Sequence, residues 1–298
     1  MKLVSIITVN FNQPLLTEQL LQSIIATNSY NNIEIIVVDN GSSINPLHVW
    51  VTAYPEIIFL RSEKNLGFAG GNNLAIQKAS GEYLFLVNND TEFTHGLIKS
   101  LVDLFESNKI IGVISPKIKF WENKNILQYA GFTAMNFVTA RNSCIGYNEL
   151  DNGQYDKITG ETAYAHGAAM MVKREVLIKA GLMAENFFLY YEELDWMERI
   201  KKSGYKIWVC MDALIYHKES MSVGKKSILK EYYMNRNRIL FIRKNGTCIQ
   251  IIIFYCYFIL VVTPRNILQY LKNKNYSFIK ALLKAIWWNF TNKTNSLK

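Results

Sequence analysis

Buried strands and helical segments alternate over the first third of the chain, and this alternation limits the possible folds most. Residues 3–9, 33–39 and 56–61 are rich in β-branched side chains, and residues 84–87 add four consecutive apolar positions. Apolar residues at helical spacing follow the first strand, and a second helix is expected to end near Lys78. The pattern predicts right-handed βαβ units, an α/β fold with a mostly parallel, Rossmann-like sheet flanked by helices.

Polar residues stand where the predicted strands end. Asp39 closes the second strand, and the triplet Asn88-Asn89-Asp90 closes the strand at residues 84–87. Open α/β sheets bind ligands at the carboxyl ends of their strands, so these side chains are candidates for a site. Asn and Asp also favour turns and helix N-caps, so a purely structural role stays open from the residues alone.

A glycine-rich segment, SEKNLGFAGGNN, follows the third strand and is expected to be a loop. It does not match the GxGxxG pattern of dinucleotide-binding sheets, which would also have to follow the first strand. A mononucleotide fits better, because the backbone at Gly67, Gly70 and Gly71 allows close approach of a ribose or diphosphate. Asp39 can accept the imide N–H of a pyrimidine, which a purine lacks.

The balance of charges and cysteines restricts the partners and the compartment. The net charge is +9, and basic residues are dense after Lys225, which suits an anionic partner without choosing among nucleotide, nucleic acid and membrane surface. The four cysteines show no CxxC spacing, so neither a zinc site nor a disulfide framework is expected, and a reducing cytosol fits best. The first apolar run is too short for a signal peptide.

Eight short motifs occur in a fixed order between residues 2 and 244: VSIITVNFN, IEIIVVDNGSS, NLGFAGGNN, LFLVNNDTEF, GAAMMVKREVL, FFLYYEELDW, ALIYHK and YYMNRNRILFIRK. Together they resemble the inverting family-2 glycosyltransferases with the GT-A fold, particularly the rhamnosyltransferase-like branch of bacterial surface polysaccharide synthesis. The resemblance implies a nucleotide-sugar donor, a divalent metal and a single-displacement reaction.

By this resemblance Asp90 is a ligand of Mg²⁺ or Mn²⁺, and His217 is the second protein ligand. A hard cation that bridges diphosphate oxygens needs few protein ligands, because phosphates and water complete its shell. Asn88 stands where the strict Asp-x-Asp motif has Asp. The candidate donor-binding residues are Asn10, Asp39, Asn65, Gly67, Gly70, Gly71, Asn72, Asn88, Asn89 and Arg236. For Arg236, as for Arg238 two residues on, the alternative is a solvated basic helix face.

An inverting transfer requires a base for the acceptor hydroxyl, and YYEELDW offers Glu192, Glu193 and Asp195 at a helix start. Acids in a first helical turn are also favoured by the helix dipole alone. The resemblance selects Glu193 as the base, with Asp195 as its substitute. The neighbouring aromatic residues form either a sugar-stacking wall or part of the core: Phe187, Phe188, Tyr190 and Tyr191.

The end of the chain is strongly apolar, with no charged residue between Lys244 and Arg265. The stretch is just long enough to span a bilayer, but both flanks are basic, which favours both ends on the cytoplasmic side. The segment FIKALLKAIWWNF pairs lysines with interfacial tryptophans. Peripheral contact with an anionic membrane is therefore preferred over a span, an internal packing role or an oligomer contact.

These patterns divide the chain into a GT-A domain at residues 1–244 and a membrane-associating helical tail at 245–298. Within the domain, residues 1–118 are expected to bind the nucleotide sugar (dTDP- or UDP-linked), and 119–244 the glycan or lipid-linked glycan acceptor. We expect rhamnose as the sugar, a cytoplasmic location at the inner face of the cell membrane, and no nucleic-acid partner. Two alternatives are a nucleotidyltransferase and a degenerate membrane scaffold; the oligomeric state stays open.

Overall fold

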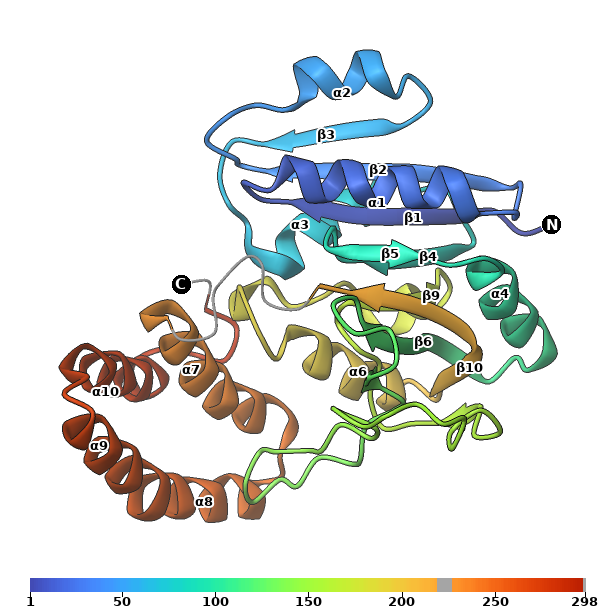
Figure 1. Ribbon diagram of the computed structural model, residues 1–298. Helices are drawn as coiled ribbons and strands as arrows, with labels where there is room; N and C mark the ends of the chain where they lie inside the picture. Colours follow the sequence, from blue (N-terminus) through green and yellow to red (C-terminus); the bar gives the residue numbers. More distant parts are fainter. Residues whose placement is uncertain (219–226, 297–298) are drawn as a thin grey trace.

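The computed structural model describes residues 1–218 and 227–296. Four parallel strands pair in the order β3-β2-β1-β4, and helices connect them (Figure 1). The strands are β1 (Val4–Asn10), β2 (Ile33–Asn40), β3 (Ile58–Ser62) and β4 (Tyr83–Val87). The connecting helices are α1 (Pro14–Thr27), α2 (Leu47–Ala53) and α3 (Gly67–Ile76). The expected alternation of strands and helices is confirmed here.

The same sheet continues through strands of mixed direction, in the order β4-β9-β6-β10-β5. These strands are β5 (Thr91–Phe93), β6 (Ile111–Phe120), β9 (Ala169–Lys173) and β10 (Lys206–His217). β9 runs antiparallel to both β4 and β6, and β5 runs antiparallel to β10. A mostly parallel sheet therefore describes β1 to β4, whereas the second half is mixed. The irregular region at residues 119–164 carries only the short strands β7 (Leu127–Tyr129) and β8 (Gly160–Glu161).

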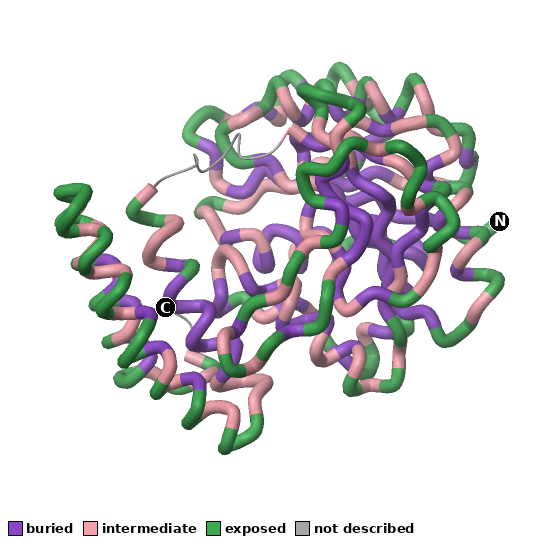
Figure 2. The backbone as a smooth tube through the Cα atoms, turned by 60° about the horizontal axis from the view of Figure 1, so that its bottom comes forward, coloured by how far each residue is buried: buried purple, intermediate pink, exposed green. Residues whose placement is uncertain are grey.

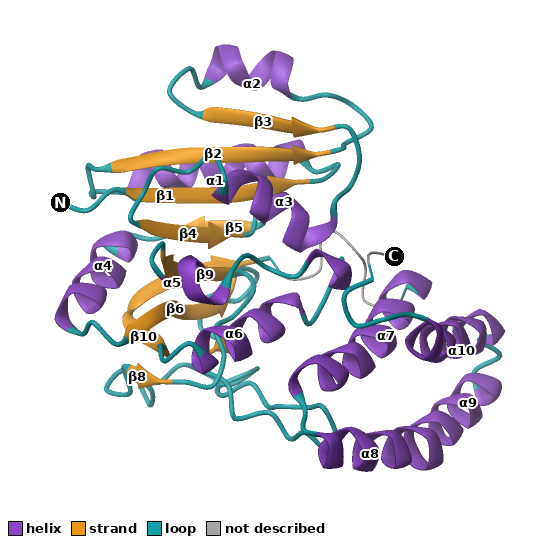
Figure 3. Ribbon diagram, turned by 180° about the vertical axis from the view of Figure 1, so that it is seen from behind, coloured by secondary structure: helices purple, strands orange, loops and turns teal. Residues whose placement is uncertain are grey.

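Two hydrophobic cores lie on the two faces of the sheet. Along β2, Ile35 and Val37 belong to one core, whereas Ile36 and Val38 belong to the other. Helices α1 and α4 (Leu97–Ser107) cover the first face. Helices α3, α5 (Val176–Ala180) and α6 (Glu192–Lys202) cover the second (Figure 3). Burial on both faces explains why these strands are continuously apolar instead of alternating with polar residues.

The last third of the chain is helical. The 3-10 turn η1 (Glu185–Phe187) leads towards α6, and α7 (Ile228–Asn245) follows β10. A helical arm, residues 248–291, then consists of α8 (Cys248–Tyr257), the π-helical turn η2 (Phe258–Val262), α9 (Thr263–Lys272) and α10 (Tyr276–Thr291). Figure 1 shows the arm curving beside α7 and away from β3.

The arm packs on the rest of the protein along narrow stripes. Phe254, Phe258 and Val262 are buried at helical spacing, and α10 buries Leu282 and Trp288. All five belong to the same core as α3 and α6. Most other positions of α8 and α9 are exposed or only half-buried, and Figure 2 shows these exposed stretches. By length and composition alone, the continuous helix Cys248–Lys272 could cross a membrane.

Candidate active site

A cavity of about 530 Å³ lies at the carboxyl ends of β1, β2 and β4, and it is called the donor cavity below. Segments far apart in the sequence meet around it, because β4 leads into Asn88–Asp90 and β10 ends at His217. Seven of the predicted site residues line it: Asn65, Gly67, Asn72, Asn88, Asn89, Asp90 and His217. The edge of the sheet at which the sequence predicts a binding site therefore contains a cavity.

Asp90 and His217 meet in this cavity. The antiparallel pairing of β10 with β5 puts His217 opposite Thr91, the residue after Asp90. Their side chains are buried, and Nε2 of His217 lies 3.1 Å from Oδ1 of Asp90. Within the described ranges 1–218 and 227–296, Oδ1 of Asp90 has no hydrogen-bond partner. A buried carboxylate oxygen without a hydrogen bond is costly unless a cation or proton compensates it.

Gln128 fixes the other side of the His217 ring. Its side-chain oxygen, as placed in the structure, lies 2.9 Å from Nδ1. An amide oxygen only accepts hydrogen bonds, so Nδ1 carries the hydrogen and the lone pair of neutral His217 resides on Nε2. This lone pair faces the Asp90 carboxylate, and the two repel each other unless a proton or a metal ion lies between them. A ligand histidine that donates its second N–H to an acceptor is the usual arrangement at metal sites.

These residues fit a hard divalent cation with few protein ligands. Among the described residues no group of three or more His, Cys, Asp or Glu side chains is arranged to hold a metal. Asp90 and His217 would supply only two positions. The remaining positions of a six-coordinate Mg²⁺ or Mn²⁺ would have to come from substrate oxygens and water.

The three candidate bases differ in their surroundings. Asp195 is buried, and its two oxygens accept hydrogen bonds from Asn245 (2.9 Å) and Arg199 (3.0 Å). Lys244 approaches the same carboxylate at 3.7 Å. Asp195 thus joins α6 to the end of α7. It is poorly suited as the substitute base, because both of its oxygens already accept hydrogen bonds within the protein.

Glu192 and Glu193 open helix α6 after a contorted segment, in which Phe188, Tyr190 and Tyr191 have positive φ angles. Burial raises the pKa of both carboxyl groups above the usual range. Glu192 is almost fully buried, whereas Glu193 is half-buried and lies over Gly167. The carboxylates are not part of the donor-cavity lining, although the preceding Leu189 and Tyr190 are. The role of Glu193 as base stays a prediction.

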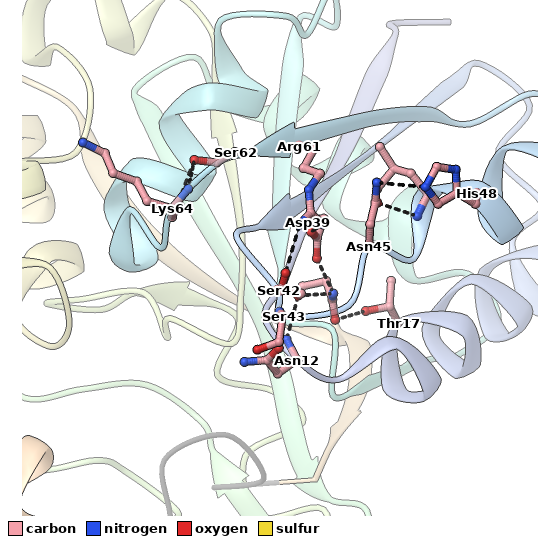
Figure 4. A network of polar contacts seen from close by, with 12 residues as sticks. Asn12, Thr17, Asp39, Ser42, Ser43, Asn45, His48, Arg61, Ser62 and Lys64 are labelled. Carbon is pink, nitrogen blue, oxygen red and sulfur yellow. Dashed lines mark hydrogen bonds and ion pairs between the residues drawn. The ribbon is translucent and has the colours of Figure 1, made fainter.

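Asp39 does not line the donor cavity but precedes Asn40, which does, and it lies in a network of polar contacts (Figure 4). Its Oδ1 accepts a hydrogen bond of 2.8 Å from Asn10, and its Oδ2 pairs with Arg61, whose guanidinium also donates to the Ser42 carbonyl. Both predicted residues, Asp39 and Asn10, are buried. Asn40, which the sequence reasoning did not select, lines the cavity instead and donates to the Gly67 carbonyl at 3.1 Å.

The glycine-rich segment, expected to be a loop, is irregular only up to Leu66, because α3 begins at Gly67 and includes all three glycines. A methyl group on Gly67 would lie 2.2 Å from the Phe188 carbonyl oxygen, and φ is +76° there. At Gly70 and Gly71 the close neighbours are the side chains of Leu66 and Val9. The predicted close approach is therefore made by protein atoms at all three glycines, and only Gly67 lines the cavity.

The geometry also corrects the expectation for Arg236. It is 1% exposed, donates to the carbonyls of Asn186 and Phe187, and lies 4.5 Å from the Trp288 ring. Its guanidinium thus holds the segment before α6 instead of reaching the donor cavity. Arg238 is buried too, so the alternative, a solvated basic face of α7, is also wrong at both positions.

The aromatic residues of the segment 187–191 are expected either to form a sugar-stacking wall or to belong to the core, and the structure divides them. Phe188 and Tyr190 line the donor cavity, whereas Phe187 and Tyr191 belong to the core. Lys230, Ser227 and Phe11 also line the cavity, and the sequence reasoning missed all three. Lys230 had a usable signal, since it is the first lysine of the basic helix that follows His217.

Comparison with known proteins identifies the family. The family model described as "Glycosyl transferase family 2" matches residues 5–181, more than half of the chain. The chain belongs to glycosyl transferase family 2. The expected family is thereby confirmed, and it disfavours the nucleotidyltransferase alternative.

Named relatives lie within the family at low identity. The chain is 27% identical over 215 residues to "Low-salt glycan biosynthesis hexosyltransferase Agl10" of Haloferax volcanii, covering 70% of this chain and 66% of that protein. It is 21% identical to "N-acetylglucosaminyl-diphospho-decaprenol L-rhamnosyltransferase" of Mycobacterium tuberculosis, covering 65% and 69%. It is 22% identical to "dTDP-rhamnosyl transferase RfbF" of Shigella flexneri, covering 85% and 87%. The first alignment thus spans just under two thirds of the relative.

Solved structures share the fold. "Mannosyltransferase PcManGT from Pyrobaculum calidifontis in complex with GDP-Man and Mn2+" superposes with a TM-score of 0.58 at 15% identity, covering 97% of this chain and 87% of that one. GalNAc-T7, solved with UDP, GalNAc and Mn²⁺, gives 0.61 at 16% identity, covering 80% and 51%. The GT-A architecture of this family-2 chain is confirmed by these likenesses, which concern the fold alone.

Proposed function

We propose that this chain is a metal-dependent, inverting glycosyltransferase that moves a sugar from a nucleoside diphosphate donor to a lipid-linked or cell-surface glycan. The observation that carries the proposal is the convergence of Asp90 and His217 in the donor cavity, with the buried Oδ1 of Asp90 lacking a hydrogen bond. Family membership and the Mn²⁺ in the names of two solved neighbours add support.

Asp90 and His217 would hold the cation, Mg²⁺ or Mn²⁺, and Gln128 would fix the His217 tautomer. When bound, such a cation neutralises the departing nucleoside diphosphate. Asn65, Asn72, Asn88 and Asn89 offer amides around the donor. Glu193 would take the proton from the acceptor hydroxyl, and its raised pKa suits a general base that works near neutral pH.

The donor is proposed to be a pyrimidine nucleotide sugar, with dTDP-rhamnose favoured. Two relatives carry rhamnosyl transfer in their names, and one of these names dTDP. Asn10 and Arg61 each engage one oxygen of the Asp39 carboxylate, and the base N–H would use one of the lone pairs that remain. Arg61 therefore belongs to the proposed base-binding group as the residue that orients Asp39.

The helical arm is proposed to hold the enzyme on the cytoplasmic face of the membrane without spanning it. Phe254, Phe258 and Val262 keep α8 and η2 packed on the protein, so the helix runs along the domain instead of away from it. The opposite side exposes a row of apolar residues: Ile249, Ile252, Ile253, Ile259, Leu260 and Val261. In this division residues 1–118 supply most of the donor cavity, and 119–244 bind the acceptor while adding His217 and one wall of the donor cavity. Residues 245–298 contact the membrane.

Transfer assays with dTDP-rhamnose, UDP-glucose and UDP-galactose, on a prenyl diphosphate-linked N-acetylglucosamine acceptor, test the proposal. We expect product only with a divalent cation present, and a loss of at least a hundredfold in Asp90→Asn. Glu18→Gln, a substitution outside the donor cavity, serves as the acid-to-amide control. Equal rates in Asp90→Asn and wild type, or undiminished transfer in EDTA, would refute metal-dependent transfer. A wild-type chain that binds donor but never turns it over would favour the scaffold alternative.

A further inference from the structure

A second cavity, of about 480 Å³, lies between α7, the arm and the loop at residues 140–142. Four cationic side chains line it, and it is called the basic cavity below: Arg141, Lys230, Arg238 and Arg265. The lining has one acid, Glu231, and this carboxylate accepts hydrogen bonds from Tyr270 and Asn235. The basic cavity therefore has a clear excess of positive charge.

The cations of the basic cavity are not paired with carboxylates in the described part of the chain, although Arg238 lies over the Phe258 ring at 5.4 Å and Arg265 donates to Asn266. Within residues 1–218 and 227–296, none of the four forms an ion pair with a carboxylate. Arg238 is 6% exposed and donates to the Thr139 carbonyl at 2.6 and 3.0 Å. Like charges that converge on a partly buried space repel one another, and a bound anion removes this repulsion.

The loop at residues 140–142, which lines the basic cavity, holds a side-chain N–H group without a hydrogen-bond partner among the described residues. Nδ2 of Asn142 is buried and has no hydrogen-bond partner among the described residues. The preceding Ala140 has a φ of +47°, an unusual angle for a residue with a side chain, and Tyr191 donates to its carbonyl at 3.2 Å. The fold thus holds a strained loop in place, and Arg141 and Asn142 of this loop line the basic cavity.

The basic cavity adjoins the donor cavity, because Ser227 and Lys230 line both. Tyr190 lines the donor cavity, and the next residue, Tyr191, lines the basic cavity. On its other side the basic cavity is bounded by α9, which exposes Leu268 and Leu271. An anion held there would have the donor on one side and apolar surface on the other.

We propose that the basic cavity binds a diphosphate group, the one that joins an acceptor sugar to its lipid. This inference rests on the proposed glycosyl transfer. Guanidinium groups bind phosphate oxygens in pairs of parallel hydrogen bonds, and the exposed Arg141 and Arg265 offer two such groups. Arg238, whose Nε and Nη2 are bonded to the Thr139 carbonyl, adds positive charge at the cavity wall. The diphosphate would fix the position of the acceptor sugar relative to Lys230 and the donor, while the lipid chain lies along α9.

Binding of two probes to the full chain in EDTA tests the site without a metal. The probes are inorganic pyrophosphate in solution and farnesyl diphosphate in phosphatidylcholine vesicles. We expect Arg141→Gln/Arg265→Gln to weaken probe binding at least tenfold. The control Lys78→Gln/Lys202→Gln removes two charges outside both cavities and should change binding less than twofold. Arg141 and Arg265 are exposed, so the variant should fold, and its melting temperature verifies this.

If binding of either probe weakens in the arginine variant but not in the lysine control, the site is supported. If only farnesyl diphosphate binding weakens, the site prefers a lipid headgroup; if only pyrophosphate binding weakens, it prefers a free anion. Equal losses in variant and control, or no binding of either probe to wild type, would overturn the proposal. A thermal shift by dTDP or UDP with Mn²⁺ distinguishes failure of the anion site from failure of donor binding. Donor binding, and with it the thermal shift, should survive Arg141→Gln/Arg265→Gln. If wild type fails to transfer sugar but still binds the probes, the proposed function fails and the anion site stands.

Discussion

His217 and Asp90 face each other at 3.1 Å because the last residue of β10 pairs opposite Thr91 in β5. The contact joins the proposed donor half, which holds Asp90, to the proposed acceptor half, which holds His217, and it depends on the pairing of the three-residue strand β5. Gln128, from β7, then selects which nitrogen of the ring faces the carboxylate.

Replacing Gln128 with Met keeps the side-chain volume but removes the acceptor for Nδ1–H. We expect Mn²⁺ affinity to fall about 10- to 100-fold, as is usual when the hydrogen-bond partner of a ligand histidine is lost. Titration calorimetry or Mn²⁺ electron paramagnetic resonance measures this in the presence of nucleoside diphosphate. Gln77→Met, on the exposed end of α3, is the matched control and should bind Mn²⁺ like wild type.

Glu193→Gln should lower kcat by about 10²- to 10⁴-fold, the range for loss of a general base, with little change in donor affinity. Because burial raises the pKa of Glu193, the wild-type rate should decline with falling pH already above the ordinary carboxyl range. Only the deprotonated form accepts a proton, so the decline is on the acidic side. Glu175→Gln, an exposed acid at α5, should leave the pH profile unchanged. An unaltered kcat in Glu193→Gln removes Glu193 as base.

Asp39→Asn should destabilise the fold as well as weaken donor binding. The carboxylate is fully buried and Arg61 is a quarter exposed, so the variant leaves a partly buried cation unpaired. The loss in the free energy of unfolding should stay below the ~3–5 kcal/mol seen for fully buried pairs. Urea unfolding measures the loss, and thermal shifts with pyrimidine and purine diphosphates measure selectivity. A stable variant whose preference for pyrimidine over purine diphosphates equals that of wild type would contradict the role of Asp39.

Ile252→Glu/Leu260→Glu should abolish sedimentation with anionic vesicles while sparing turnover of a soluble acceptor analogue. Both side chains are exposed on the arm, at 63% and 73%. The new charges should therefore change the stability of the free protein little, but they should oppose insertion of the arm into a bilayer. Ile178→Glu is the control, because Ile178 is 87% exposed on α5, outside the arm. Unchanged vesicle binding in the arm variant would show that another surface contacts the membrane.

The sequence predicts the parallel half of the sheet because each strand is a separate run of apolar residues. It also carried an unused signal for α4, whose Leu97, Leu101 and Phe105 repeat at helical spacing. The antiparallel insertion of β9 between β4 and β6 has no local signature, since Ala169–Lys173 looks like any other buried strand. Strand order depends on long-range pairing, which a single sequence does not reveal.

The site was predictable where a motif stands at a strand end, and less so where function depends on register. Asp90 and His217 are both terminal to strands, so a resemblance could select them. The partner of Asp39 was not predictable, because Arg61 becomes its neighbour only through the pairing of β2 with β3. For Arg236 the arginine and its helix were visible in the sequence, but the carbonyl groups it binds come from the segment around Asn186, far away in the chain.

The π-helical turn η2 has a mechanical consequence for the arm. Such a turn holds one residue more than an α-helical turn, which rotates everything beyond it by about 100° relative to an uninterrupted α-helix. Deleting one residue among 259–261 would restore regular α-helical winding. Arg265 would then be rotated about the helix axis and point in a different direction. The single surplus residue thus sets the angle between the exposed apolar side chains of the first half of the helix and Arg265 in the second half, which lines the basic cavity.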